Sequence, residues 1–338
     1  MPEYAVGPDV VRVTLIVGVV FSMVVYERMQ LTTGGAIVPA YLAMAVFRPV
    51  AVVATVLIGL ATYAVVAKGI GRRWILYGRT KFEVEVLVGI AFILMSTVLA
   101  GLAGRADPAL AGLAGIGFLV PGIIAHDMSR QRPGRTVAAL LLTSAVLATF
   151  MWLYASILSL TSFGGPGAVE DLASVLGYPR EFLLLAVATS VLVGMVVFAK
   201  LGIRSGGFIT GAYVALVSPR WWDLAFSAIV AFIVWAIVVH VLMPRLLVFG
   251  RRKLSTMILV SGLVAWPVEL LLRSVSHGDY VPWRGLTIAT LMVPALIAND
   301  AQRQGWERTA FGVGLTCTGV LAVANLGGAL TSWLGWSL

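Results

Sequence analysis

Charged side chains are scarce in this chain of 338 residues. Asp, Glu, Lys and Arg make up 12% of the residues and hydrophobic residues 60%, whereas a soluble domain carries about 25% charged residues. So few polar groups cannot cover a water-exposed surface, and the apolar residues come in runs of about 20, the length that crosses a ~30 Å hydrocarbon core. A soluble enzyme, a nucleic-acid-binding domain and a disordered protein are therefore excluded. We predict a polytopic α-helical membrane protein.

Residues that carry catalysis or bind metals are also scarce. The single cysteine, Cys317, excludes an intramolecular disulfide and a cysteine-cluster metal site, and the three histidines (His126, His240 and His277) are scattered along the chain. The sequence contains no G-x-x-x-x-G-K-[ST], H-E-x-x-H or G-x-S-x-G motif. The first residues lack a basic region and a cleavage site, so we expect the first span to be retained. We expect no cofactor, no metal and no catalysis by this chain.

The chain is a tandem duplication. Residues 34–44 (GGAIVPAYLAM) match residues 206–216 (GGFITGAYVAL), and 77–82 (YGRTKF) match 249–254 (FGRRKL). Residues 120–131 (VPGIIAHDMSRQ) match 293–304 (VPALIANDAQRQ) at nearly the same spacing. Polar pairs that recur in order are not produced by chance between apolar spans. We predict a first repeat over 1–160, an outer linker over 161–180 and a second repeat over 181–338.

Each half holds six apolar segments, and the second and fifth of each half are short and rich in glycine. The segments cover roughly 10–26, 34–47, 49–67, 83–103, 111–125 and 137–158, then 182–199, 206–217, 222–243, 255–273, 284–298 and 309–331. Fourteen helical residues reach only about 21 Å at ~1.5 Å per residue. The short segments are therefore short crossings, broken helices or re-entrant loops.

The distribution of basic residues favours six crossings in each half, with both termini outside. Of the 24 Lys and Arg, 17 then lie inside: Arg28, Lys68, Arg72, Arg73, Arg79, Lys81, Arg130, Arg132, Arg135, Lys200, Arg204, Arg245, Arg251, Arg252, Lys253, Arg303 and Arg308. This split obeys the positive-inside rule, and Trp152, Trp221, Trp222, Trp283, Trp333 and Trp336 collect at the predicted outer interface. An even number of crossings makes the two repeats parallel, so we expect a multi-pass protein of the plasma membrane with about twelve segments.

Polar residues at the edges of the short segments form the first candidate site. Glycine pairs let the backbone pack closely or leave helical geometry, and irregular backbone at membrane depth lines protein or a cavity. Close packing through small residues explains the pairs equally well. The residues of this group, which we interpret as turn or pathway positions, are Glu27, Gly34, Gly35, Pro39, Tyr41, Gly206, Gly207 and Tyr213, with Pro121 and Pro294 in the fifth segments.

Two repeated charged motifs form the other candidate sites. Gly78-Arg79-x-Lys81 recurs as Gly250-Arg251-x-Lys253, and this spacing favours a fixed turn that presents two cations to an anionic partner. Its simpler interpretation is anchoring by positive charge. The second motif has Asp and Arg three residues apart, where they can pair on one helical face as a structural salt bridge or organise the mouth of the short crossing. It comprises Asp127, Arg130 and Gln131, repeated as Asp300, Arg303 and Gln304.

These stretches resemble the PgsC/CapC family, the membrane subunit of poly-γ-glutamate synthase in capsule biosynthesis. The resemblance rests on 27–43 (ERMQLTTGGAIVPAYLA), 75–82 (ILYGRTKF) and 115–131 (GIGFLVPGIIAHDMSRQ), and it is looser in the second half. It implies a cytosolic ATP-dependent amide ligase (PgsB/CapB-like) and an outer accessory subunit (PgsA/CapA-like) as partners. It also implies an anionic polymer as client, and single-unit relatives that work as oligomers.

The resemblance therefore implies a non-catalytic subunit that docks the ligase and helps to export the polymer. The basic loops fit this function, because a polymer with one carboxylate per residue would be drawn to them. The alternative is a stand-alone secondary transporter or channel for a small anion, since short broken segments also suit that class. A transporter should carry ionisable groups near the midplane, and apart from His240 the spans have almost none there by sequence, which disfavours a transporter and also an integral membrane transferase.

Overall fold

A computed structural model describes residues 7–104, 113–160, 180–277, 279–283 and 286–333. The predicted outer linker lies almost entirely outside these residues. The chain divides into two compact units, Met1–Val169 and Glu170–Leu338, so each unit holds one predicted repeat. The regular structure in the described part of the chain is helical, which confirms the predicted fold class.

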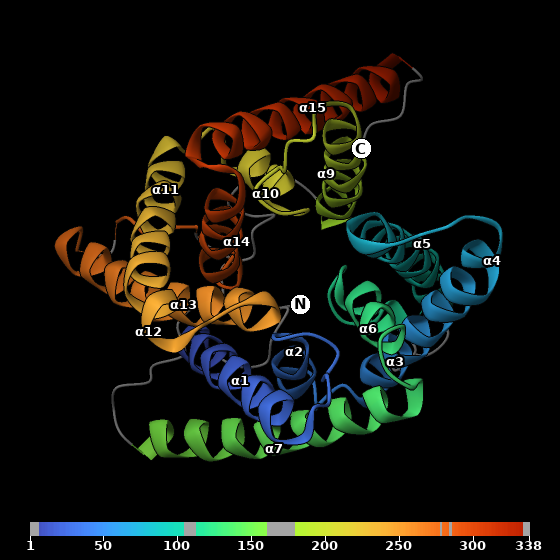
Figure 1. Cartoon of the computed structure of the whole chain (residues 1–338), viewed down its shortest axis with the longest axis horizontal. Helices are drawn as coiled ribbons and strands as arrows, with labels where there is room; N and C mark the ends of the chain where they lie inside the picture. Colours follow the sequence, from blue (N-terminus) through green and yellow to red (C-terminus); the bar gives the residue numbers. More distant parts are fainter. Residues whose placement is uncertain (1–6, 105–112, 161–179, 278, 284–285, 334–338) are drawn as a thin grey trace. The chain divides into compact units, whose positions relative to one another are not determined.

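The described residues of the first unit form four long helices and two short ones, which Figure 1 labels. The long helices are α1 (Pro8–Met29), α3 (Pro49–Tyr63) continued by the π-helix η1 (Ala64–Ile70) and α4 (Gly71–Arg73), α5 (Gly78–Ala103) and α7 (Pro133–Leu160). The short ones are α2 (Val38–Met44) and α6 (Val120–Met128). Helix α7 lies along α1 and α2, while α6 lies beside α3 and α5.

The second unit repeats this order. Its long helices are α9 (Arg180–Leu201), α11 (Trp221–Ala236) continued by η3 (Ile237–Leu242) and α12 (Met243–Leu246), α13 (Gly250–Val275) and α15 (Trp306–Trp333). The shorter ones are α10 (Thr210–Val217) and α14 (Ala289–Gln304). Among the described residues of the chain, eight helices are long and apolar enough to cross a membrane, four in each unit.

The second segment of the first unit runs back along α1 as non-helical chain followed by helix α2. The chain reverses at Gln30, which is left-handed (φ 55°), and Thr33 then bonds Ser22 of α1 (Oγ to Oγ1, 2.6 Å). Further along, Ala40 packs against Gly18, near the middle of α1: a Cβ added at Gly18 would lie 2.7 Å from the Ala40 Cβ. The segment thus runs antiparallel to α1 although α2 itself has seven residues.

The fifth segment is built in the same way and runs in the opposite direction. Residue Gly115 packs against Ile93, and Gly122 lies against Val86 nearer the start of α5, so the segment is antiparallel to α5. Both short helices begin with Val-Pro, at Val38 and Val120, after glycines with positive φ. Proline is tolerated at the first helical positions because their N–H groups have no intrahelical acceptor.

The first unit therefore consists of two three-segment modules of opposite direction. Module one is α1, the α2 segment and α3–α4, and module two is α5, the α6 segment and α7. Their short helices pack beside each other, since a Cβ at Gly35 would lie 2.6 Å from Ile123. The buried core joins them, with Val38 and Leu42 of α2 packed with Ile124 of α6 and Leu140 of α7.

In the second unit, the loop before α14 is fixed to the start of α11 by Asp223. This fully buried carboxylate accepts hydrogen bonds from the Tyr280 hydroxyl (2.8 Å) and the Trp283 N–H (3.2 Å), and it lies 3.1 Å from Arg220 Nε. The Trp283 ring also donates to Ser227 Oγ (2.8 Å). Trp283 is 1% exposed, so this aromatic residue packs inside the unit.

Candidate binding site at the basic end of each unit

Basic side chains gather at one end of each unit, which we call the basic end. In the first unit it is the end where α1 stops and α5 begins, because Gln131, before α7, bonds Thr32, just after α1. Its cations are Arg28, Lys68, Arg72, Arg73, Arg79, Lys81, Arg130, Arg132 and Arg135, and in the second unit Lys200, Arg204, Arg245, Arg252, Lys253, Arg303 and Arg308. The side chain of Arg251 lies outside what the structure describes.

A glutamine in each unit forms hydrogen bonds to the non-helical chain that leads to the short helix. The Gln131 side chain accepts from the Thr32 N–H (3.1 Å) and donates to the Thr32 carbonyl (2.7 Å) and to Thr136 Oγ1 (2.8 Å). In the second unit, Gln304 makes the same three contacts with the backbone of Arg204 and with Thr309. This glutamine clamp gives the Gln of the repeated Asp-x-x-Arg-Gln motif a structural role.

The Gly-Arg-x-Lys motif forms a turn into a helix in both units. Gly78 and Gly250 have φ of 57° and 61°, in the left-handed region that glycine tolerates, and each begins a long helix. In the first unit, Arg79 Nε lies 2.5 Å from Glu83 Oε1. In the second unit, Lys253 is 5% exposed and its Nζ lies 2.5 Å from Gln302 Oε1.

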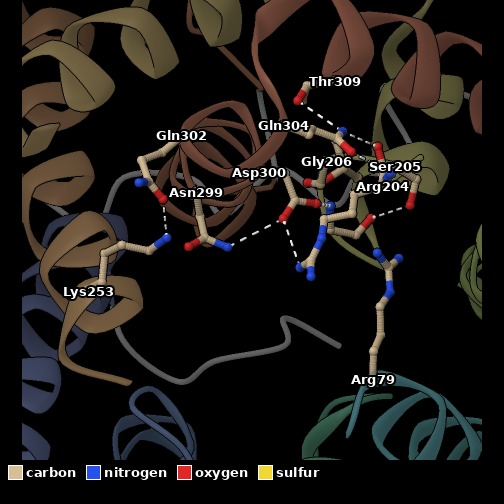
Figure 2. Close-up of polar contacts among 12 residues, drawn as sticks. Arg79, Arg204, Ser205, Gly206, Lys253, Asn299, Asp300, Gln302, Gln304 and Thr309 are labelled. Carbon is tan, nitrogen blue, oxygen red and sulfur yellow. Dashed lines mark hydrogen bonds and ion pairs between the residues drawn. The ribbon is translucent and has the colours of Figure 1, made fainter. Parts of the chain in front are cut away.

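In the second unit, the two charged motifs and the chain before α10 meet in one polar cluster (Figure 2). Asp300 Oδ2 accepts from the Gly207 N–H (3.1 Å), and its Oδ1 lies 3.8 Å from Arg204 Nη1. Asn299 donates to Asp300 at 3.4 Å, and Lys253 contacts Gln302 on the same helix, α14. The structure thus pairs Asp300 with Arg204, a residue that we did not single out from the sequence.

The glycine pairs of the first candidate site lie in tightly packed surroundings. A Cβ at Gly206 would lie 2.5 Å from Val313 and one at Gly207 would lie 2.9 Å from Leu296, so larger residues do not fit there. The Tyr213 ring lies 6.3 Å from the Trp283 ring, and Pro39 and Pro121 are buried at the starts of α2 and α6. Glu27 is exposed at the end of α1. For the glycines, close packing explains the sequence.

Two buried carboxylates in the first unit were missed by the sequence interpretation. Glu83 is 4% exposed and Glu85 is fully buried, and both lie in α5 within a candidate membrane span. Both lie near the start of α5 and not at the middle of the span, where the sequence predicted almost no ionisable group apart from His240. The available signal was two acidic residues spaced i, i+2 at the start of an apolar run, just after the Gly-Arg-x-Lys turn. They escaped notice because the helix begins at Gly78, before the apolar run.

Comparison with known proteins decides the family. The family model of the capsule biosynthesis protein CapC matches the chain twice, over residues 17–137 and 189–310. The chain belongs to the CapC family. One match lies in the first unit and the other in the second. This confirms that two CapC-like repeats follow one another in this chain.

Two curated relatives agree with this assignment. The PGA biosynthesis protein CapC of Bacillus subtilis (strain 168) is 32% identical over 142 residues, which are 42% of this chain and 93% of the relative. The capsule biosynthesis protein CapC of Bacillus anthracis is 32% identical over 146 residues, with the same shares covered. No solved structure matches the chain. The relatives are thus as long as one repeat, and this CapC chain carries two.

Proposed function

We propose that the chain is a non-catalytic membrane subunit of a poly-γ-glutamate synthesis and export complex, whose basic ends receive the anionic polymer. The observation that carries the proposal is the convergence of the two repeated charged motifs at one end of each unit. The curated relatives act in PGA and capsule biosynthesis by name, which supports the same pathway for this chain. A polymer with a carboxylate on every residue complements such a concentration of cations.

The cations differ in how freely they can meet a polymer. Arg130 and Arg303, the equivalent arginines of the two units, are exposed. Guanidinium groups bind carboxylates through two parallel hydrogen bonds, which favours them as contacts for a polycarboxylate. By contrast, Arg79 bonds the buried Glu83, so its removal would leave a buried carboxylate without that partner. The exposed arginines therefore give the cleaner test.

Binding of fluorescent poly-γ-glutamate to the full purified chain in detergent tests the proposal. We expect Arg130→Ala with Arg303→Ala to weaken binding ~10- to 30-fold, because each exposed charge pair contributes on the order of 1 kcal/mol. The matched control is Arg48→Ala with Arg273→Ala, which removes two exposed arginines from the opposite ends and should change affinity less than about twofold. Equal losses in both pairs would mean that net charge alone attracts the polymer, and the basic ends would lose their proposed role.

Monomeric glutamate distinguishes the small-anion transporter. If the sites serve a polymer, free glutamate competes only weakly, because it lacks the multiple linked carboxylates that give a polymer avidity. Competition by glutamate at an affinity similar to that of the polymer would favour the transporter instead.

Docking of the ligase is the second part of the proposal, and exposed apolar residues at the basic ends support it. Trp74, Ile75 and Tyr77 are 71%, 92% and 78% exposed beside the Gly-Arg-x-Lys turn. The second unit has Leu246, Leu247 and Phe249 at the equivalent positions, all exposed. Aromatic residues next to arginines are typical of protein interfaces.

Co-purification of the ligase with the full chain tests this docking. We expect Trp74→Ala to reduce the amount of ligase recovered, since an interfacial aromatic often dominates the binding energy. Trp152→Ala is the matched control, because Trp152 is 59% exposed on α7, away from the basic end. Unchanged recovery with Trp74→Ala, or equal loss with Trp152→Ala, would count against docking at this loop.

A further inference from the structure

A carboxylate and an imidazole form a buried pair in the first unit. Glu85 of α5 is fully buried, and its Oε2 lies 2.6 Å from Nδ1 of His126 on α6. The His126 side chain is 16% exposed, and the Phe82 ring packs edge-on against it with centroids 4.8 Å apart. The second oxygen of Glu85, Oε1, has no hydrogen-bond partner among the described residues.

A buried pair that carries a net charge destabilises the folded unit, and binding a proton removes that charge. A carboxylate buried with one oxygen unbonded loses hydration that a single hydrogen bond does not replace. One added proton takes a neutral imidazole and a carboxylate from a net charge of −1 to zero, and the partly exposed His126 offers the route by which that proton enters.

The second unit shows that the architecture does not need the pair. Met257 and Asn299 occupy the positions equivalent to Glu85 and His126, and α13 and α14 pack together there as α5 and α6 do. Met257 is fully buried. The same packing therefore forms with an apolar side chain in place of the carboxylate, and packing alone does not account for the pair.

We propose that Glu85 and His126 form a proton-binding site that takes up and releases one proton as the chain moves its anionic client, and that the second unit lacks this site. The coupling to the client rests on the proposed function, whereas the proton site itself does not. The two halves then differ in what they do, because the first unit carries the proton and the second holds the buried Lys253 and the Arg204–Asp300 pair.

The neighbouring titratable groups are compatible with such a site. Glu83 is engaged by Arg79, and Asp127 is buried on α6 one residue after His126. The others on the elements packed against the pair are Lys81 on α5, Tyr63 on α3, Lys68 on η1, Tyr41 on α2 and Arg135 on α7. Cations outnumber acids in this set.

Infrared difference spectroscopy of the full chain in liposomes tests the proton site. Stepping the pH from about 8 to about 5 should produce the carbonyl band of a buried carboxylic acid or a change in the imidazole bands. Glu85→Gln should remove the carboxyl signal, and so should Glu85→Met with His126→Asn, which copies the second unit. Glu307→Gln, on an exposed carboxylate, should leave it unchanged. A carboxyl band that survives Glu85→Gln would overturn the proposal. So would a carboxyl band that appears only in sodium buffer and not in choline buffer.

Polymer output in cells tests the coupling. We expect Glu85→Gln and the Glu85→Met/His126→Asn double variant to lose output at unchanged membrane abundance, while Glu307→Gln, on an exposed carboxylate, retains it. Normal output from a chain without the infrared signal would overturn the coupling. The proposed function fails separately: it fails if the Arg130/Arg303 variant binds polymer normally, whatever the Glu85 variants do.

Discussion

The glutamine clamp should raise the free energy needed to open the non-helical chain before each short helix. Replacing Gln131 by Ala removes three hydrogen bonds, to the Thr32 N–H, the Thr32 carbonyl and Thr136 Oγ1. Each such bond contributes about 0.5–1.5 kcal/mol net, and a buried backbone group left without a partner costs ~1–3 kcal/mol. Thr32 is 8% exposed and Thr136 is fully buried. We therefore expect local opening to become easier by about 3 kcal/mol, which is roughly 100-fold in an equilibrium constant.

Hydrogen–deuterium exchange measures this opening directly. In the Gln131→Ala chain, amides of residues 30–37 should exchange roughly 100-fold faster, while those of residues 202–209 keep their rate. Gln304→Ala should give the reverse pattern, because it holds the second unit in the same way. Gln30→Ala is the control, since Gln30 is exposed and makes one long side-chain bond of 3.3 Å. Unchanged exchange over 30–37 in Gln131→Ala would refute the clamp.

Two further predictions concern one loop contact and one helix contact. Burial, and then the hydrogen bond to Asp223, raise the pKa of Tyr280 above its ordinary 10.0, so this contact stabilises the loop fully below about pH 10 and is lost as the pH rises through the raised value. In alkaline absorbance titrations, Tyr280→Phe should therefore delete a late-titrating tyrosine, and an unchanged titration curve would contradict this. At the α5–α6 contact, a Cβ at Gly122 would lie 2.6 Å from the Val86 Cα, so Gly122→Ala should destabilise the chain by about 1–3 kcal/mol. Its equivalent in the second unit is already Ala295, so Ala295→Gly should cost only about 1 kcal/mol, and thermal unfolding in detergent compares the two.

The long helices could be predicted from the sequence because apolar runs of about 20 residues have few alternatives in a membrane. The family resemblance and the duplication could be predicted from short motifs of glycine and charged residues that recur in order, such as Gly34-Gly35 and Gly206-Gly207. The residue at which helix begins within each short segment could not be predicted, since the hydropathy of 34–44 is similar before and after that residue. That boundary depends on tertiary contacts of Thr33 and Ala40 with α1.

Most of the site lay beyond sequence reasoning for a similar reason. Arg79 and Lys253 were expected to face an anionic partner, and the structure shows that each also contacts a neutral or acidic side chain of its own unit. The Arg79–Glu83 pair is spaced i, i+4 on one helix, a pattern that the sequence does contain. Lys253 and Gln302 lie far apart in the sequence, and no local pattern predicts their contact. The spacing of Glu83 and Glu85 does not show that both side chains are buried, or that His126 of α6 lies against Glu85.

The two opposed modules of the first unit carry their arginines at different ends of corresponding segments. In module one, arginines follow the first and third segments, at Arg28 and at Arg72 and Arg73, whereas in module two they precede the first segment and follow the second, at Arg79 and Arg130. The apolar outline of a module therefore does not determine its orientation, and a few arginines encode it. Moving those arginines to the other ends of the segments should reverse the orientation that a module prefers in the membrane.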